Sequence, residues 1–139
     1  MKIEPYIHKV QYYETDQMAI VHHSNYIRWF EEARVDFLDK IGYGYKVMEE
    51  QGIISPVTGV NCKYKSMTRF GDTVRIKTKI LLFNGVTLKI AYQISDTESG
   101  ELRAYGESDH CFISEEGKLL SVKRANKDFY DCLLSYVDE

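Results

Sequence analysis

The spacing of apolar residues changes once along the chain, from a period near 3.6 to a period of two, and this change constrains the fold. Before it, apolar side chains recur every three or four residues, at Tyr26, Phe30, Ala33, Phe37 and Ile41. This spacing is typical of an amphipathic helix with one buried stripe. Ser24 is the predicted N-cap of the helix, and Gly42 is the glycine expected to end it.

Beyond Gly52 apolar and polar residues alternate, which is typical of strands in an antiparallel sheet with one covered face. Four such strands are predicted, over residues 54–64, 74–82, 88–95 and 102–114. Asn84-Gly85 joins the second strand to the third, because this pair tolerates the positive φ of a hairpin turn. We therefore expect the four strands to form an antiparallel meander.

Three shorter elements complete the predicted order, a strand over 7–13, a helix over 44–51 and a C-terminal helix over 126–137. The long helix has one apolar stripe and the sheet has one apolar face, so each is expected to cover the other. A chain of 139 residues holds about one domain. The sequence therefore predicts a single α+β domain over residues 1–139.

The composition of the chain argues against several classes of protein. The formal net charge is −3, whereas general nucleic-acid binders are usually basic. No segment approaches the ~20 apolar residues of a membrane span, and residues 1–10 lack the apolar stretch of a secretory signal. The three cysteines, at positions 62, 111 and 132, have no paired-ligand spacing. We therefore expect a cytoplasmic protein with free thiols that neither binds nucleic acid nor inserts into a membrane.

The residues around position 16 place a carboxylate just before the start of the long helix. Asp16 lies in a polar stretch, and the helix is expected to begin near His23 or Ser24. A helix N-terminus has unpaired N–H groups and a partial positive charge, which polarise a carbonyl group. A carboxylate facing it attacks that carbonyl or activates water to do so. An aspartate before a helix is more often a turn or capping residue, so the spacing alone leaves both interpretations open.

The same segment resembles the N-terminal signature of the hot-dog-fold acyl-CoA thioesterases, in particular the 4-hydroxybenzoyl-CoA thioesterase group and its YbgC-like branch. The signature reads YETD at 13–16 and, six residues later, HSNY at 23–26. The similarity continues through RWFEEAR at 28–34 and RFGD at 69–72, and it covers about residues 6–125. The resemblance implies a long central helix wrapped by an antiparallel sheet, and it implies hydrolysis of acyl-CoA thioesters.

The resemblance also implies a role for each motif residue. Asp16 matches the catalytic carboxylate, which acts as nucleophile or general base. The backbone N–H of His23 is expected to polarise the thioester carbonyl, and the His23 side chain matches the histidine of the YbgC-like branch. Tyr13 matches a tyrosine that positions the carboxylate or water, while Ser24 and Asn25 are expected to contact the substrate. The chain departs from the family at residues 17–19, where many members have small residues including glycine.

Coenzyme A carries phosphate groups, which call for basic side chains. The candidates are Lys63, Lys65 and Arg69, although a solvated strand face explains each of them as well. No cofactor is expected beyond coenzyme A itself, which is part of the substrate. A metal site built from Asp16, His22, His23 and His110 is disfavoured, because the spacing matches no metal motif.

Family members pair two sheets edge to edge and place their sites at the subunit boundary, so the resemblance implies a homodimer or homotetramer. Free sheet edges also have to be covered or blocked in any such fold. The sequence leaves open the acyl group and the carrier of the thioester. An acyl-carrier-protein thioesterase and a non-catalytic acyl-CoA-binding module are the alternative functions.

Overall fold

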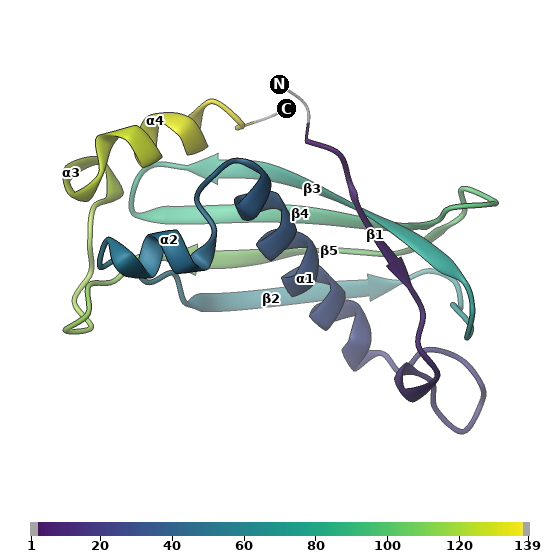
Figure 1. Cartoon of the computed structure of the whole chain (residues 1–139). Helices are drawn as coiled ribbons and strands as arrows, with labels where there is room; N and C mark the ends of the chain where they lie inside the picture. The colour runs from purple at the N-terminus through teal and green to yellow at the C-terminus, as the bar shows by residue number, and fades with distance from the viewer. Residues whose placement is uncertain (1–2, 138–139) are drawn as a thin grey trace.

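One antiparallel sheet, crossed on one face by a long helix, forms the centre of the computed structural model, which describes residues 3–137 (Figure 1). The strands are β1 (Tyr6–Lys9), β2 (Val57–Tyr64), β3 (Thr73–Phe83), β4 (Thr87–Asp96) and β5 (Leu102–Cys111). Their order across the sheet is β1-β3-β4-β5-β2, so β1 and β2 form the two edges. The predicted combination of a long helix with an antiparallel sheet is confirmed.

The long helix, α1 (Ser24–Lys40), buries the predicted stripe against the sheet. The ring of Phe30 lies flat on that of Tyr92 in β4, with centroids 4.4 Å apart and planes inclined by 10°. Alternate residues of β3 and β4 are buried on the same face, namely Val74, Ile76, Ile80, Ile90 and Ile94. Gly42, at φ +91°, follows the end of the helix as predicted.

The remaining helical segments are a 3₁₀ turn, η1 (Tyr12–Glu14), and the helices α2 (Tyr45–Glu50), α3 (Val122–Ala125) and α4 (Lys127–Leu134). The C-terminal helix predicted over 126–137 is present as α4, but it ends at Leu134, and the short helix α3 before it was not predicted. Helix starts twice in this region, and Asn126 separates α3 from α4. The side-chain oxygen of Asn126 accepts a hydrogen bond from the backbone N–H of Phe129, which makes Asn126 the N-cap of α4.

Three predicted strands were too long, and the one expected over 102–114 ends at Cys111. The strand expected over 7–13 ends at Lys9, because the Glu14 carboxylate bonds back to the N–H of Gln11 at 2.8 Å and closes the η1 turn. The strand expected from residue 54 begins at Val57, directly after Pro56, which has no N–H to donate. Ile54 forms only an isolated bridge with Ile113.

The expected four-stranded meander was also wrong in part, because only β3, β4 and β5 follow one another across the sheet. Gly85, at φ +90°, supports the short turn between β3 and β4, as predicted. The chain between β2 and β3 is longer and crosses to the other side of the meander, so β2 pairs with β5. This crossover leaves β2 as a sheet edge, next to the first turn of α1.

Candidate active site

Asp16 lies at the start of a tight loop that is closed by a bridge between Thr15 and Val21. The Asp16 N–H donates to the carbonyl of Ile20 at 2.8 Å, and one carboxylate oxygen, Oδ1, accepts the Met18 N–H at 2.8 Å. Within residues 3–137 no donor is bound to the other oxygen, Oδ2. The side chain is half-buried. One oxygen of Asp16 therefore stabilises the turn, and the second oxygen stays free.

The first turn of α1 leaves one backbone amide without an acceptor. The neighbouring amides bond to the Thr68 carbonyl (from Val21, 2.8 Å), the Glu14 carbonyl (from His22, 2.9 Å), His22 Nδ1 (from Ser24, 3.2 Å) and the His22 carbonyl (from Asn25, 3.0 Å). For the His23 N–H, the part of the chain that the structure describes contains no acceptor. This is the amide that the resemblance assigns to the thioester carbonyl.

The N-cap of α1 is His23, so the prediction that Ser24 caps the helix was wrong by one residue. Ser24 lies inside the first turn, and its hydroxyl is 2.8 Å from Nδ1 of His22. The same ring nitrogen accepts the Ser24 N–H, so it takes the place of a capping oxygen. The two histidine rings stack at 4.2 Å, with His23 exposed.

Tyr64, at the end of β2, is a site residue that the sequence analysis missed. Its hydroxyl donates to the His23 carbonyl at 3.3 Å, and its ring packs edge-on against the rings of His23 and Tyr26. Alternation along β2 places Tyr64 on the face that carries α1, which is the signal that could have found it. The contact fixes the helix N-terminus to the sheet edge.

Glu14, two residues before Asp16, is a buried carboxylate with three donors. Its oxygens accept from His8 Nε2 at 2.9 Å, from the Gln11 N–H at 2.8 Å and from Trp29 Nε1 at 2.8 Å. Burial acts to raise the pKa of this carboxyl, but the Gln11 N–H, His8 and Trp29 together outweigh burial and hold the pKa below its usual value. Glu14 therefore stays ionised inside the protein.

The structure uses Asn25 internally, although the sequence analysis expected it to contact the substrate. The side chain is buried, and its Nδ2 donates to the carbonyl oxygen of Glu14 at 2.8 Å. Its donor group therefore faces away from solvent and joins α1 to the segment that leads to Asp16.

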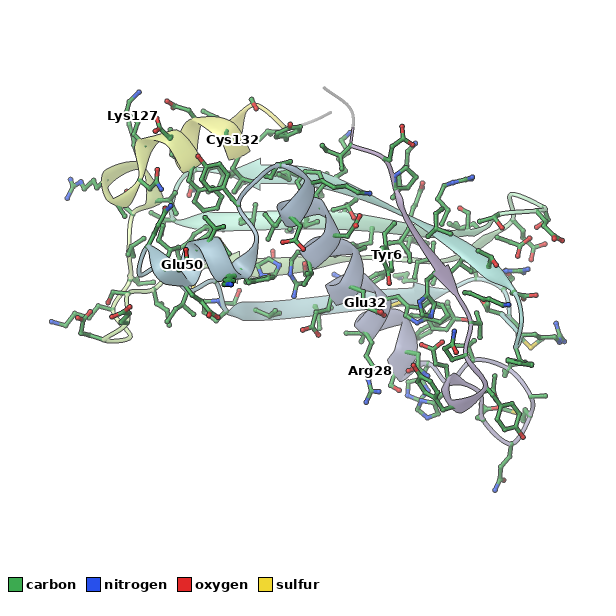
Figure 2. All side chains as sticks on the ribbon, in the orientation of Figure 1. Tyr6, Arg28, Glu32, Glu50, Lys127 and Cys132 are labelled. Carbon is green, nitrogen blue, oxygen red and sulfur yellow. The ribbon has the colours of Figure 1, made fainter. Side chains whose placement is uncertain are left out.

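Tyr13 is 80% exposed, and within residues 3–137 no hydrogen bond links it to Asp16. It lines a cavity of about 650 Å³ between β1 and α1, which also contacts Glu14 and Asn25 but neither Asp16 nor His23. Tyr6 of β1 and Glu32 of α1, both labelled in Figure 2, also line this cavity, and the tyrosine hydroxyl donates to the carboxylate at 3.2 Å. The expected role of Tyr13 stays a prediction.

The three basic candidates occupy different places. Lys63 lies opposite Tyr105 in the sheet register, on the face away from α1, and the Lys65 ammonium lies 5.7 Å from the centre of the Tyr105 ring. Arg69 forms a backbone bridge with Ile20, so it alone borders the loop that carries Asp16. All three side chains are exposed.

Metal ligands do not gather at this site. Within residues 3–137, no group of three or more His, Cys, Asp or Glu side chains is arranged to hold a metal ion. His110 is buried on β5, where its Nε2 lies 2.8 Å from the Ser108 hydroxyl. The three cysteines are free. Among the described helices, none is long and apolar enough to cross a membrane.

Comparison with known proteins identifies relatives over most of the chain. The model of the thioesterase-like superfamily matches residues 10–128. YneP of Bacillus subtilis, named a "Putative acyl-CoA thioesterase", is 36% identical over 123 residues, which are 88% of each chain. The acyl-CoA thioester hydrolase YbgC of Escherichia coli O157:H7 is 24% identical over 91 residues, which are 66% of this chain and 68% of YbgC.

The fold has solved counterparts. The DHNA-CoA thioesterase of Staphylococcus aureus superposes with a TM-score of 0.89 and is 33% identical, covering 95% of this chain and 89% of its own. A protein from Aquifex aeolicus, described as hypothetical, superposes with a TM-score of 0.85 at 31% identity, covering 93% of this chain and 98% of its own. The match of sequence and of fold over the same residues shows that this chain is a hot-dog protein and belongs to the thioesterase-like superfamily.

Proposed function

We propose that the protein hydrolyses acyl-CoA thioesters to the free acid and coenzyme A. The observation that carries this proposal is the free N–H of His23 beside the loop in which Asp16 keeps one carboxylate oxygen unbound. The names of YneP and YbgC support acyl-CoA as the substrate class. The reaction consumes one water molecule and requires no cofactor beyond the substrate.

Each group has a defined task in this reaction. The thioester carbonyl oxygen accepts the His23 N–H, which stabilises the negative charge that develops on it, often by about 3 kcal/mol. Asp16 Oδ2 then attacks the carbonyl carbon, or it removes a proton from a water molecule that does so. The C–S bond breaks and the sulfur leaves as the thiol of coenzyme A. In the nucleophilic route water next cleaves the acyl–Asp16 anhydride and releases the acid.

Arg69 is the basic residue best placed to meet a coenzyme A phosphate, because its backbone pairs with the loop that holds Asp16. Lys63 and Lys65 lie on the other face of the sheet, so in one chain they are on the wrong side for the same task. Replacing coenzyme A by an acyl carrier protein would leave the chemistry unchanged. Parallel assays with acyl-CoA and acyl-carrier-protein substrates separate the two functions.

We also propose a homodimer that forms through β2. Val57, Val60 and Tyr64 of this edge strand are 44–48% exposed, although they point to the same side as α1. A free strand edge with exposed apolar side chains is an aggregation hazard unless another strand covers it. Pairing of β2 with β2 of a second copy would cover the free backbone edge and the exposed apolar side chains, and it obeys two-fold symmetry.

The decisive experiment replaces Asp16 by Asn. The amide oxygen of Asn still accepts the Met18 N–H, so the loop is retained while the reactive carboxylate is lost. We expect kcat to fall by about 10² to 10⁴ with an unchanged melting temperature. The assay is thiol release from short, medium, long and aromatic acyl-CoAs.

Asp96→Asn is the matched control, because Asp96 also accepts backbone N–H bonds in a turn but lies at the end of β4. It should retain the wild-type kcat. Wild-type turnover by Asp16→Asn would contradict the proposal. Tight binding of acyl-CoA without thiol release by the wild-type protein would indicate a binding module instead.

A further inference from the structure

The carboxylate of Glu14 ties three elements together at one buried point. His8 comes from β1, Gln11 from the start of η1 and Trp29 from the second turn of α1, and each donates to it within 2.9 Å. His8 also packs against Trp29, with ring centroids 4.8 Å apart. Glu14 is only 4% exposed, so this contact is shielded from water. Its geometry is fixed by donors on three sides.

The backbone carbonyl of Glu14 makes a second connection, to the helix N-terminus. It accepts the His22 N–H at 2.9 Å and Nδ2 of Asn25 at 2.8 Å. One donor comes from the residue before His23 and the other from the residue two positions after it. The carbonyl oxygen is thus bonded to the chain on both sides of the free His23 amide, to His22 before it and to Asn25 of α1 after it.

We propose that Glu14 is the positioning residue of the active site, which aligns the Asp16 carboxylate with the His23 N–H. This inference rests on the proposed thioester hydrolysis. Asp16 is two residues from Glu14, and the His22 amide that Glu14 holds is adjacent to His23. Glu14 touches no reacting atom in this mechanism. It acts by fixing the two segments that carry the reacting groups.

An ionised carboxylate suits this position because every group around it is a donor. Glutamine has the same shape, but it presents an NH₂ group in place of one oxygen. If its oxygen keeps Gln11 and His8, the NH₂ group faces the N–H of Trp29, and two donors then oppose each other. Removing the indole N–H with Trp29→Phe relieves that conflict, so the two substitutions should be coupled.

The test measures kcat and KM for Glu14→Gln, Trp29→Phe and the double variant. We expect Glu14→Gln to lower kcat by about 10- to 100-fold, since a misplacement near 1 Å has effects of that size. KM should change by less than about twofold, because no substrate contact is lost. The double variant should have a higher kcat than the product of the two single effects predicts. Independent effects, or a rise in KM alone, would overturn the proposal.

Tyr92→Phe is the matched control for loss of stability. It removes a buried hydroxyl that bonds to Arg34 and Ser108, neither of which contacts the Glu14 carboxylate. We expect a lower melting temperature with unchanged kcat. An equal fall in kcat for this variant and Glu14→Gln, at equal loss of melting temperature, would show that Glu14 is merely structural.

Asp16→Asn in the same assay separates the two proposals. If Asp16→Asn is inactive and Glu14→Gln turns over like the wild type, the positioning role fails and thioester hydrolysis by Asp16 stands. If Asp16→Asn retains the wild-type kcat, the proposed mechanism itself fails. If Asp16→Asn and Glu14→Gln both lose kcat, and Glu14→Gln combined with Trp29→Phe recovers part of it, both proposals hold.

Discussion

The two oxygens of Asp16 have different tasks, and this division reconciles the structural and the catalytic interpretation of the residue. Oδ1 closes a turn with the Met18 N–H, as aspartates before helices commonly do. Oδ2 is left for chemistry. A turn that uses one oxygen also restricts the rotation of the carboxylate, so the free oxygen has a defined direction. Structural use and catalytic use therefore support each other at this residue.

Ala19, in the same loop, is the one residue other than glycine with positive φ in the part of the chain that the structure describes, at +64°. A residue with a Cβ atom is strained there, whereas glycine is not. We therefore expect Ala19→Gly to raise the free energy of unfolding by up to about 1 kcal/mol, less the extra entropy that glycine gives the unfolded chain. Urea denaturation measures the change. A clear loss of stability would show that the Ala19 methyl group makes contacts worth more than the strain.

At the scale of elements, a buried chain of polar groups joins α1 to the sheet. Arg34 donates to the hydroxyl of Tyr92 at 3.2 Å, Tyr92 lies 2.7 Å from the Ser108 hydroxyl, and Ser108 lies 2.8 Å from His110 Nε2. Arg34 also donates to Tyr45 of α2 at 2.8 Å. Within residues 3–137 no carboxylate pairs with Arg34. Burial first, and then the charge of Arg34, lower the pKa of His110 to about 4.

This lowered pKa makes the stability of the fold depend on pH. In the unfolded chain the pKa of His110 is near 6.5, so between pH 6.5 and pH 4 the unfolded state binds a proton that the folded state does not. The free energy of unfolding should therefore fall as the pH drops through this range, by an amount on the order of 3 kcal/mol from this residue. His110→Gln, which keeps an acceptor for Ser108, should show a correspondingly flatter pH dependence in urea denaturation. Identical slopes for the two proteins would contradict the assignment.

Regular elements were predictable where one period persists over many residues. The stripe of α1 and the alternation in β3 and β4 gave their positions directly, because each side chain in these elements faces a single environment. The turn at residues 12–14 is closed by the local bond from the Gln11 N–H to Glu14, but the burial of Glu14 was not predictable, since it depends on His8 and Trp29, which lie on other elements. Local sequence carries no sign of such contacts.

The residues of the candidate site were likewise predictable only where the signal is local in the sequence. Asp16 and His23 were found through a motif that is contiguous in sequence. Tyr64 and the internal role of Asn25 depend on where β2 and the segment before Asp16 lie relative to α1. The sequence offered Lys63 as a candidate to bind a coenzyme A phosphate, and the sheet register puts it on the face away from α1. Tertiary arrangement decides each of these three cases.

At the scale of the whole molecule, a single chain leaves the site open. Neither the cavity beside Tyr13 nor a second cavity of about 520 Å³, near Phe37 and Tyr136, contacts Asp16 or His23. Tyr64 belongs to β2, which is an edge strand of the sheet and, within residues 3–137, has no strand paired to its outer side (Figure 1). A second copy docked along this edge would supply the missing wall and would bury the apolar side chains of β2.

Val60→Lys tests this arrangement, because a charged side chain in the middle of an edge strand opposes pairing with a second strand. Residue 60 lies near the middle of β2, so in a two-fold β2–β2 pair centred on this strand the new lysine lies close to its own symmetry mate and the two charges repel. We expect the wild type to be a dimer or larger at micromolar concentration and the variant to be a monomer, as measured by light scattering after gel filtration. Ile7→Lys is the matched control, since Ile7 is equally exposed, at 50%, but lies on β1 at the opposite edge. A wild-type monomer, or dissociation by Ile7→Lys and not by Val60→Lys, would rule out β2 as the interface.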